Sequence, residues 1–383
     1  MDQRSRPLVV GAGPVGLAVA LFVARHSAAP RVIELRHDPS VQSKALAVNP
    51  RTLEILEPTG VTGRMLERGL KIHAASLHGA GKTIANISLT GIHARYPFML
   101  ALSQATTERL LEEALLAAGG AVERGKKLVE CRNSADGVEA VIEPTAGGQR
   151  EQVDCPWLLA ADGAHSAVRE QLEIDFPGAA FERPWHLADV PLRTGLPEDH
   201  AHIFLLDDGA FLFLIRVVDD WRQEQGQTPL WRIIANRSEP LSLLADAEQA
   251  GPVVWASDFR IAHRIASTLA AGKVYFAGDA AHIHSPMGAR GMNLGIEDAC
   301  VFAALERVGR LAEYNALRRP VDERVVRQVE RLSRIVAGES AIARLLRRFA
   351  FPLAVRIPPV RARMVPTLTG LDHDLPNVVG NPP

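Results

Sequence analysis

The sequence has few cysteines and few aromatic residues, and neither sign of charge is in excess. Its 383 residues include three cysteines, Cys131, Cys155 and Cys300, with no C-x-x-C spacing. Neither a disulfide framework nor a thiolate zinc site fits this pattern, so we predict reduced, buried thiols. The 43 basic and 44 acidic residues give a net charge of −1, which lacks the basic surplus typical of nucleic-acid-binding proteins. We therefore expect no nucleic acid partner.

Composition and length indicate an ordinary globular chain with more than one domain. Hydrophobic residues make up 47% and charged residues 23% of the sequence, which excludes a wholly disordered, collagen-like or coiled-coil chain. The length favours two intertwined domains. Charge is uneven, because residues 306–366 contain fourteen arginines and six acidic residues. We interpret these arginines as solvated faces of surface helices; contact with an anionic membrane or a partner is the alternative.

A run of uncharged residues from Leu8 to Ala24 follows two arginines near the amino terminus. A signal peptide or a short membrane span is one interpretation of such a run. Glycines within it favour another, because they stand in G-x-G-x-x-G order at Gly11, Gly13 and Gly16. We predict no membrane span and a cytoplasmic protein.

These glycines fit a βαβ unit made of a strand at 8–10, a helix at 17–26 and a strand at 31–35. The first glycine permits a tight turn, the second lets a pyrophosphate approach the backbone, and the third brings the helix against the strand. Glu34 ends the second strand, where a carboxylate can bind the hydroxyls of an adenosine ribose. The unit predicts a dinucleotide site, and the residues alone leave NAD and FAD both open.

Alternating strand and helix signals continue to residue 172. Asn49 or Thr52 can start a helix at 53–57, residues 70–102 contain strands such as 84–89, and Gln104 begins a helix. Strands are predicted within 128–144 and 153–161, followed by Asp162-Gly163 and a helix at 166–172.

Residues 176–255 form a second strand-rich block, which predicts a separate sheet. Its strongest strands are 203–206 and 210–218, and the polar segment 219–227 is expected to be a loop. Phe211 and Phe213 share one strand face by the two-residue period, whereas Phe204 belongs to the neighbouring strand.

The stretch from Lys273 to Ala299 is the most informative part of the chain. A strand leads into Gly278 and Asp279, then a loop carries Pro286 and Gly288. A helix is predicted to begin near Gly291, so its positive end faces whatever ligand lies at the loop.

Together, the glycine motif, Asp162-Gly163 and the Gly278-Asp279 segment with its Pro-x-Gly-x-x-Gly-Met-Asn continuation resemble the class A FAD-dependent aromatic monooxygenases, the family of para-hydroxybenzoate hydroxylase and phenol hydroxylase. The resemblance spans about residues 7–320. It implies an α/β fold in which a Rossmann-type FAD-binding domain (1–70, 103–175 and 256–320) is interleaved with a smaller, β-sheet-rich substrate domain (71–102 and 176–255). Residues 321–383 would form a helical or irregular C-terminal segment, and the thioredoxin-like domain of the phenol hydroxylase branch is expected to be absent.

The resemblance also implies roles for individual residues. Gly11, Gly13 and Gly16 would hold the FAD pyrophosphate, and Glu34 the adenosine ribose. Asp162 would serve both FAD and the nicotinamide, Asp279 would bind the ribityl hydroxyls beside Gly278, and Pro286 would border the reaction site. Gly288 is also expected among the cofactor-binding residues. Backbone groups of Gly291, Met292 and Asn293 would reach the flavin's pyrimidine edge. The remaining matches to cofactor-binding positions are Lys44, Arg51 and Gln104. Arg290 departs from the glutamine that many relatives have there.

By this resemblance the protein binds FAD non-covalently and uses NADH or NADPH as a transient co-substrate. It would hydroxylate a small or polycyclic phenolic ring through a flavin 4a-hydroperoxide formed with O2, and a homodimer is a possible assembly. Alternatives on the same fold are an epoxidase, a dehydrogenase or a halogenase, although the W-x-W-x-I-P halogenase motif is missing. A non-catalytic flavin-binding protein, disabled by Arg290, is a further alternative.

Several polar residues suggest other chemistry, which we consider weaker. His282, His284 and Asp279 could be imagined as metal ligands, but they offer no evident full ligand set, so no metal is expected. Ser166 and His165 lack the G-x-S-x-G context of a hydrolase. We predict Asp298 on a helix surface. His73, His202 and Arg216 are interpreted as structural or exposed, and we name no catalytic base.

Overall fold

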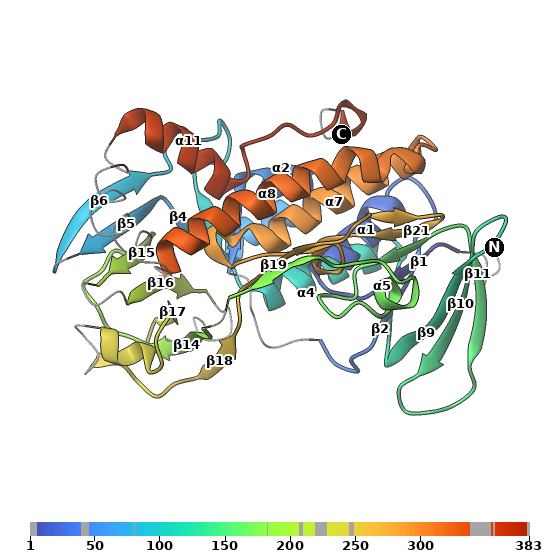
Figure 1. Cartoon of the computed structure of the whole chain (residues 1–383), viewed down its shortest axis with the longest axis horizontal. Helices are drawn as coiled ribbons and strands as arrows, with labels where there is room; N and C mark the ends of the chain where they lie inside the picture. The colour runs from blue at the N-terminus through green and yellow to red at the C-terminus, as the bar shows by residue number, and fades with distance from the viewer. Residues whose placement is uncertain are drawn as a thin grey trace.

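The computed structural model describes residues 6–39, 46–79, 81–181, 183–206, 210–218, 228–244, 249–337, 354 and 357–380. Lys44 and the predicted loop 219–227 lie outside these residues. Figure 1 shows β-sheets at both ends of the view, with long helices running across the region between them.

A six-stranded sheet contains the predicted βαβ unit at the amino terminus. Its strand order is β20-β21-β12-β1-β2-β8, and all neighbours are parallel except β20 and β21. The strands are β1 (Leu8–Val10), β2 (Arg31–Glu34), β8 (Val122–Arg124), β12 (Leu158–Ala160), β20 (Ala270–Ala271) and β21 (Val274–Phe276). Parallel strands are covered on both faces, which explains why β1, β12 and β21 are wholly apolar and buried.

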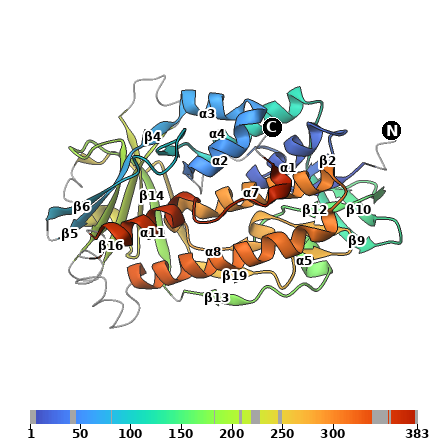
Figure 2. The same ribbon diagram turned by 90° about the horizontal axis from the view of Figure 1, so that it is seen from above.

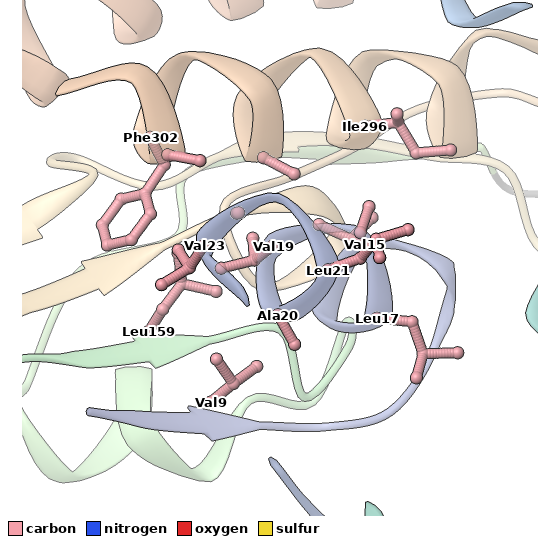
Figure 3. Packing of buried hydrophobic residues seen from close by; sticks show 14 of the residues in the cluster. Val9, Val15, Leu17, Val19, Ala20, Leu21, Val23, Leu159, Ile296 and Phe302 are labelled. Atoms are coloured by element: carbon pink, nitrogen blue, oxygen red, sulfur yellow. The ribbon is translucent and has the colours of Figure 1, made fainter. Parts of the chain in front are cut away.

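Helix α1 (Pro14–Ala24) lies between this sheet and helix α7 (Arg290–Arg307), as Figure 3 shows. Its Val15 and Val19 lie near α7, and Ala20 lies toward Val9 of the sheet. Burial on both sides explains why α1 has no polar face. The uncharged run Leu8–Ala24 is therefore a strand and a core helix, and among the described residues we find no helix with the length and apolarity to cross a bilayer.

A seven-stranded sheet forms the opposite end of the molecule, with the order β18-β14-β17-β16-β15-β5-β6. One of its faces packs toward the rest of the molecule through Phe211, Phe213 and Ile203. The other face carries Leu212, Leu214 and Trp231. The strands are β5 (Ala74–Gly79), β6 (Lys82–Ser88), β14 (Trp185–Pro191), β15 (His200–Leu205), β16 (Phe211–Val217), β17 (Leu230–Ala235) and β18 (Trp255–Phe259).

Three small sheets complete the strands, each with three members. They are β3 (Ala47–Val48), β7 (Met99–Ala101) and β4 (Leu70–Ile72); β11 (Glu151–Cys155), β10 (Val138–Pro144) and β9 (Lys126–Asn133); and β13 (Gly178–Ala180), β19 (Ala262–Ile265) and β22 (His282–Ile283).

Helices α7 and α8 run alongside each other across the molecule, and the chain after α11 returns along α7 (Figures 1 and 2). The remaining helices are α2 (Pro50–Leu56), α3 (Val61–Arg68), α4 (Gln104–Ala117), α5 (Ala167–Gln171), α8 (Tyr314–Ala337) and α11 (Pro358–Thr369). Short 3₁₀ turns are η2 (Glu57–Thr59), η3 (Pro240–Leu243), η5 (Gly278–Ala280), η6 (Met287–Ala289), η7 (Leu311–Glu313) and η9 (Asn377–Val379).

The predicted α/β fold with a separate sheet is confirmed, and most predicted elements are present within a few residues. Helix α1 begins three residues earlier than predicted because Pro14 fits the first turn of a helix. Asn49, rather than Thr52, caps α2 by accepting a hydrogen bond from the Thr52 amide at 2.8 Å.

The expectations about the burial of the cysteines and of the C-terminal arginines need correction. All three cysteines are free, but only Cys155 is buried, whereas Cys131 and Cys300 are partly exposed. The arginines of α8 are largely solvated, as Arg324, Arg327, Arg331 and Arg334 are exposed. Arg318 is the exception, because it is fully buried.

Candidate active site

Three neighbouring strands of the six-stranded sheet end at the three sequence motifs. Strand β1 leads into Gly11, β12 into Asp162 and β21 into Gly278. These strands are adjacent and parallel, in the order β21-β12-β1. Because the carboxyl ends of parallel strands meet at one edge, loops far apart in the sequence converge there, where ligands bind in open α/β sheets.

The glycines of the first motif have distinct surroundings. Gly11 has a φ of +101°, and a Cβ there would lie 2.4 Å from the Ala161 carbonyl oxygen. A Cβ on Gly16 would lie 2.0 Å from the Gly11 carbonyl oxygen, so α1 can approach the turn only without a side chain. Apart from its two chain neighbours, no described residue comes within 4 Å of a Cβ built on Gly13. The turn therefore leaves open space at the amino end of α1, where free amides favour an anion.

Glu34 is tied to this turn. Its Oε2 accepts a hydrogen bond from the Ala12 amide at 2.8 Å, and its Oε1 accepts from the Arg36 side chain at 2.9 Å. Burial raises the pKa of this carboxyl, but the hydrogen bonds from Arg36 and Ala12 outweigh it and lower the pKa overall. Glu34 is therefore held as an anion at the end of β2.

Asp162 is placed at the middle loop with spare hydrogen-bonding capacity. Its Oδ2 accepts a long hydrogen bond from the Val168 amide at 3.4 Å, while its buried Oδ1 has no partner among the described residues. Burial raises the pKa of Asp162, although Ser166 and backbone amides at the start of α5 oppose this. An unpaired buried acceptor is costly, so this oxygen is suited to bind a ligand hydroxyl.

Arg169 connects two of the three loops and is absent from our sequence-based predictions. Its Nη1 donates to the Ala280 carbonyl at 3.0 Å, and its Nη2 donates to the Ala164 carbonyl at 2.9 Å. The signal available in the sequence is the spacing Asp162-Gly163-x-x-Ser166-x-x-Arg169. Ser166 caps α5 by accepting from the Arg169 amide at 3.1 Å and is fully buried, so it is not available as a hydrolase nucleophile.

The third loop connects β21 to the start of α7. Asp279 is exposed, and a Cβ on its neighbour Gly278 would lie 2.8 Å from Val15. Pro286 is exposed as well, and Gly288 and Ala289 both have left-handed φ angles, of 74° and 51°. This bend turns the chain into α7, whose first turn carries the free amides and the positive end of the helix dipole.

The guanidinium of Arg290 is directed to the C-terminal segment of the chain. The Arg290 side chain is 1% exposed, and its Nη1 donates to the Thr367 carbonyl at 2.6 Å and to Asp372 Oδ1 at 3.0 Å. The Arg290 guanidinium is therefore held at the C-terminal segment, where it does not occupy the space of a ligand at the opening.

Other predicted residues hold the loops together. The side chain of Asn293 accepts from the Asn49 amide at 3.0 Å and donates to the Ala47 carbonyl at 2.9 Å. Arg51 donates to the His373 carbonyl at 2.7 Å, and Gln104 donates to Glu108 at 2.8 Å. Met292 packs against the main hydrophobic core. A Cβ built on the neighbouring Gly291 would have His284 Cε1, at 3.8 Å, as its one contact with the described residues beyond its own helix and chain neighbours.

Behind the third loop lies a buried charge cluster that includes His282. Its Nε2 is 2.8 Å from Asp298, and Arg318 donates to Asp298 at 2.7 Å and to Asp322 at 2.9 Å. Asp298 is fully buried, so the prediction that it lies on the helix surface is wrong: three hydrogen-bonding partners compensate its burial.

His282, Asp298 and Asp322 lie close enough together to resemble a metal site, since one ligand atom of each lies within 4.8 Å of the others. The Arg318 guanidinium already contributes positive charge to these carboxylates. His284 does not join the cluster, because its Nδ1 bonds to the Ser285 carbonyl at 2.8 Å, and burial lowers its pKa to about 3. The arrangement is that of a buried ion-pair network.

The seven-stranded sheet presents an apolar inner face toward this edge. Ile203, Phe213 and Ile234 cluster there with Met287 of the third loop. His202 lies on the outer face beside Trp231 and bonds to the Pro197 carbonyl at 2.9 Å, while burial lowers its pKa to about 4. Arg216 pairs with Glu198, and His73 is exposed. These three residues thus have the structural or exposed positions predicted for them.

Comparisons with known proteins agree with this geometry. The family described as "FAD binding domain" matches residues 4–329. The chain is 32% identical over 377 residues to 6-methylpretetramide 4-monooxygenase of Streptomyces rimosus, covering 93% of this chain and 67% of that protein. It is 28% identical over 360 residues to pentachlorophenol 4-monooxygenase of Sphingobium chlorophenolicum, covering 86% and 65%.

Solved structures share the fold. The p-nitrophenol 4-monooxygenase of Pseudomonas putida superposes with a TM-score of 0.81 at 24% identity, covering 96% of this chain and 98% of that one. The flavin-dependent monooxygenase PieE, solved with FAD and substrate, superposes with a TM-score of 0.77 at 20% identity, covering 98% and 73%.

Proposed function

Because the chain belongs to the FAD-dependent aromatic monooxygenase family, we propose that it uses NADH or NADPH and O2 to hydroxylate a phenolic or polycyclic aromatic compound. The observation that carries this proposal is the convergence of the loops after β1, β12 and β21 at one edge of the parallel sheet. That edge faces an apolar sheet wall, as a site for an extended cofactor and a ring requires.

The residues at this edge fit FAD. The space at Gly13 and the amino end of α1 would take the pyrophosphate, Glu34 the adenosine ribose, and Asp279 the ribityl chain. The amides at Gly291 and Met292 would face the pyrimidine edge, and Lys44, Arg51, Gln104 and Asp162 would complete the site. When bound, FAD supplies the redox and oxygen chemistry that side chains lack.

The protein's own part is to orient the ring, exclude water and stabilise charge. The positive end of α7 favours negative charge on a ligand at its first turn. Ile203, Phe213, Ile234 and Met287 form an apolar wall that would keep water from the reacting atoms.

This wall supports an uncharged or weakly polar ring as substrate. Arg232 lies on the same face by strand alternation, but Asp189 neutralises it through two hydrogen bonds of 2.7 Å. The relatives include enzymes named for a polycyclic compound, 6-methylpretetramide, and for a single ring, pentachlorophenol. We propose residues 71–102 and 176–255 as the substrate domain that distinguishes between such rings.

The test uses the FAD-loaded full chain with NADH or NADPH and a panel of one-ring and fused-ring phenols. We expect the correct phenol to stimulate nicotinamide oxidation and to gain one oxygen atom from isotope-labelled O2, seen by mass spectrometry. Flavin that neither nicotinamide reduces, or a product labelled from water, would contradict the proposal.

A further inference from the structure

The C-terminal residues 367–373, named here the C-terminal clasp, contact the start of α7. Arg290, the first residue of α7, donates to the Thr367 carbonyl at 2.6 Å and to Asp372 at 3.0 Å. The Arg290 side chain is 1% exposed and that of Asp372 is 8% exposed. The pair is therefore shielded from solvent, where its charges interact strongly.

The clasp also contacts the start of α2. The backbone carbonyl of His373 accepts a hydrogen bond from Arg51 at 2.7 Å. Gly370 has a φ of +81°, and a Cβ on it would lie 2.2 Å from the Asn49 side chain. Asn49 in turn donates its amide to Asn293 of α7, so the clasp, α2 and α7 form one connected unit.

His373 adds a second connection to α7. Its Nε2 is 2.7 Å from Glu297, and its Nδ1 is 3.1 Å from Asp372. Glu297 and Asp372, with Arg290 and Arg318 nearby, are the charged groups that face this ring. The clasp thus contacts α7 at its first turn and again about two turns further along.

The start of α7 depends on such support for a physical reason. Its N-cap is Ala289, which has a left-handed φ of 51° and no side-chain hydrogen bond to the helix. Arg290 then places a positive charge in the first turn, where the helix dipole disfavours it. Asp372 compensates that charge from outside the helix, and without it Arg290 would be a buried cation at a positive helix end.

We propose that the C-terminal clasp is a positioning element of the FAD site, with Asp372 holding Arg290 and the start of α7, and His373 holding Arg51. The clasp acts through these residues and does not itself touch the cofactor. This inference rests on the FAD placement proposed above.

Asp372→Asn in the full-length protein is the decisive variant. If the clasp positions α7, the variant binds FAD about ten-fold or more weakly, because the negative charge that compensates the buried Arg290 is lost. Its flavin midpoint potential also becomes more negative, since the positive helix end is less well placed. If Arg290 acted by its charge alone, removing the counter-charge would make the potential more positive and overturn the proposal. FAD affinity equal to that of the wild type would overturn it as well.

Two further variants separate this test from general loss of stability and from a misplaced cofactor. Arg31→Gln removes an arginine that, like Arg290, is buried and paired with carboxylates, here Glu123 and Glu151. Arg31 lies at the start of β2, away from Glu34 at its end. We expect this variant to have a lower midpoint of thermal unfolding and unchanged FAD affinity. Asp279→Asn tests the FAD placement itself. Weaker FAD binding in Asp279→Asn but not in Asp372→Asn would contradict the clasp alone, whereas no effect of Asp279→Asn would contradict the placement.

Discussion

His282 and Asp298 share a hydrogen bond of 2.8 Å in which neither side chain is exposed to solvent. His282 lies four residues after Gly278, and Asp298 also accepts a hydrogen bond from the Gly278 amide at 3.2 Å. The pair therefore supports, from behind, the loop that carries the proposed ribityl-binding residue Asp279. The charges of this pair therefore affect both the stability of the fold and the position of the loop that carries Asp279.

Asp298→Asn tests how much this cluster stabilises the protein. The substitution removes a buried charge that compensates both Arg318 and His282, and breaking such a pair lowers the free energy of unfolding by about 3 to 5 kcal/mol. Urea denaturation of the two proteins at neutral pH gives this difference. In the control Glu139→Gln, whose partner Arg132 is exposed, we expect a loss below about 1 kcal/mol. Equal losses in both variants would show that the cluster is not special.

The same cluster predicts how stability depends on pH. Burial lowers the pKa of His282, but the charges of Asp298 and Asp322 outweigh it and raise the pKa to about 9, above the ordinary value of 6.5. Protonated His282 therefore stabilises the fold fully below about pH 6.5, and this contribution is lost as the pH rises through about 9. Burial raises the pKa of Asp322 to about 7. Protonated Asp322 therefore also stabilises the fold at low pH, and this contribution is lost as the pH rises through about 7.

Urea denaturation at a series of pH values between about 6 and about 9.5 measures this slope. The free energy of unfolding should fall across the range in the wild type and fall less steeply in His282→Gln. A wild-type stability that rises with pH over this range would contradict the predicted charge state of His282.

The glycine turn allows a test that separates binding from folding. Gly13→Ala places a methyl group in open space and has an allowed φ of −72°, so we expect apoprotein stability within about 1 kcal/mol of the wild type. FAD affinity should fall, because the pyrophosphate approaches the backbone at that position. Gly16→Ala should instead destabilise the apoprotein, since its Cβ would meet the Gly11 carbonyl oxygen. Titration of the apoproteins with FAD, together with their thermal unfolding, checks both. Unchanged FAD affinity in Gly13→Ala would exclude this position as the pyrophosphate site.

The parts of the site that could be predicted are those whose sequence signals are local. Gly11, Gly13 and Gly16 fall between a strand and a helix, so strand and helix periodicity is sufficient to locate them. Asp298 and Arg318 could not be predicted as buried, because a charged helical residue is usually solvated. Its burial is tolerable here through partners distant in the sequence, such as the 2.7 Å contact between α7 and α8. The Arg290–Asp372 pair joins residues 82 positions apart, and no pattern near Arg290 indicates its partner.

Two phenylalanines on opposite faces of the seven-stranded sheet test the proposed substrate wall. Phe213 lies on the inner face with Met287, whereas Phe204 lies on the outer face and stacks on His78 with ring centroids 4.3 Å apart. Both are partly buried, so truncation removes a similar apolar side chain in each. Phe213→Ala should raise the KM for the aromatic substrate about ten-fold and increase peroxide released per nicotinamide oxidised, because the ring loses apolar contact and water gains access. Phe204→Ala should lower thermal stability while leaving KM and peroxide release unchanged. Steady-state kinetics with parallel measurement of peroxide and hydroxylated product distinguishes the two, and a substrate KM that responds to Phe204 instead of Phe213 would place the ring on the other face of the sheet.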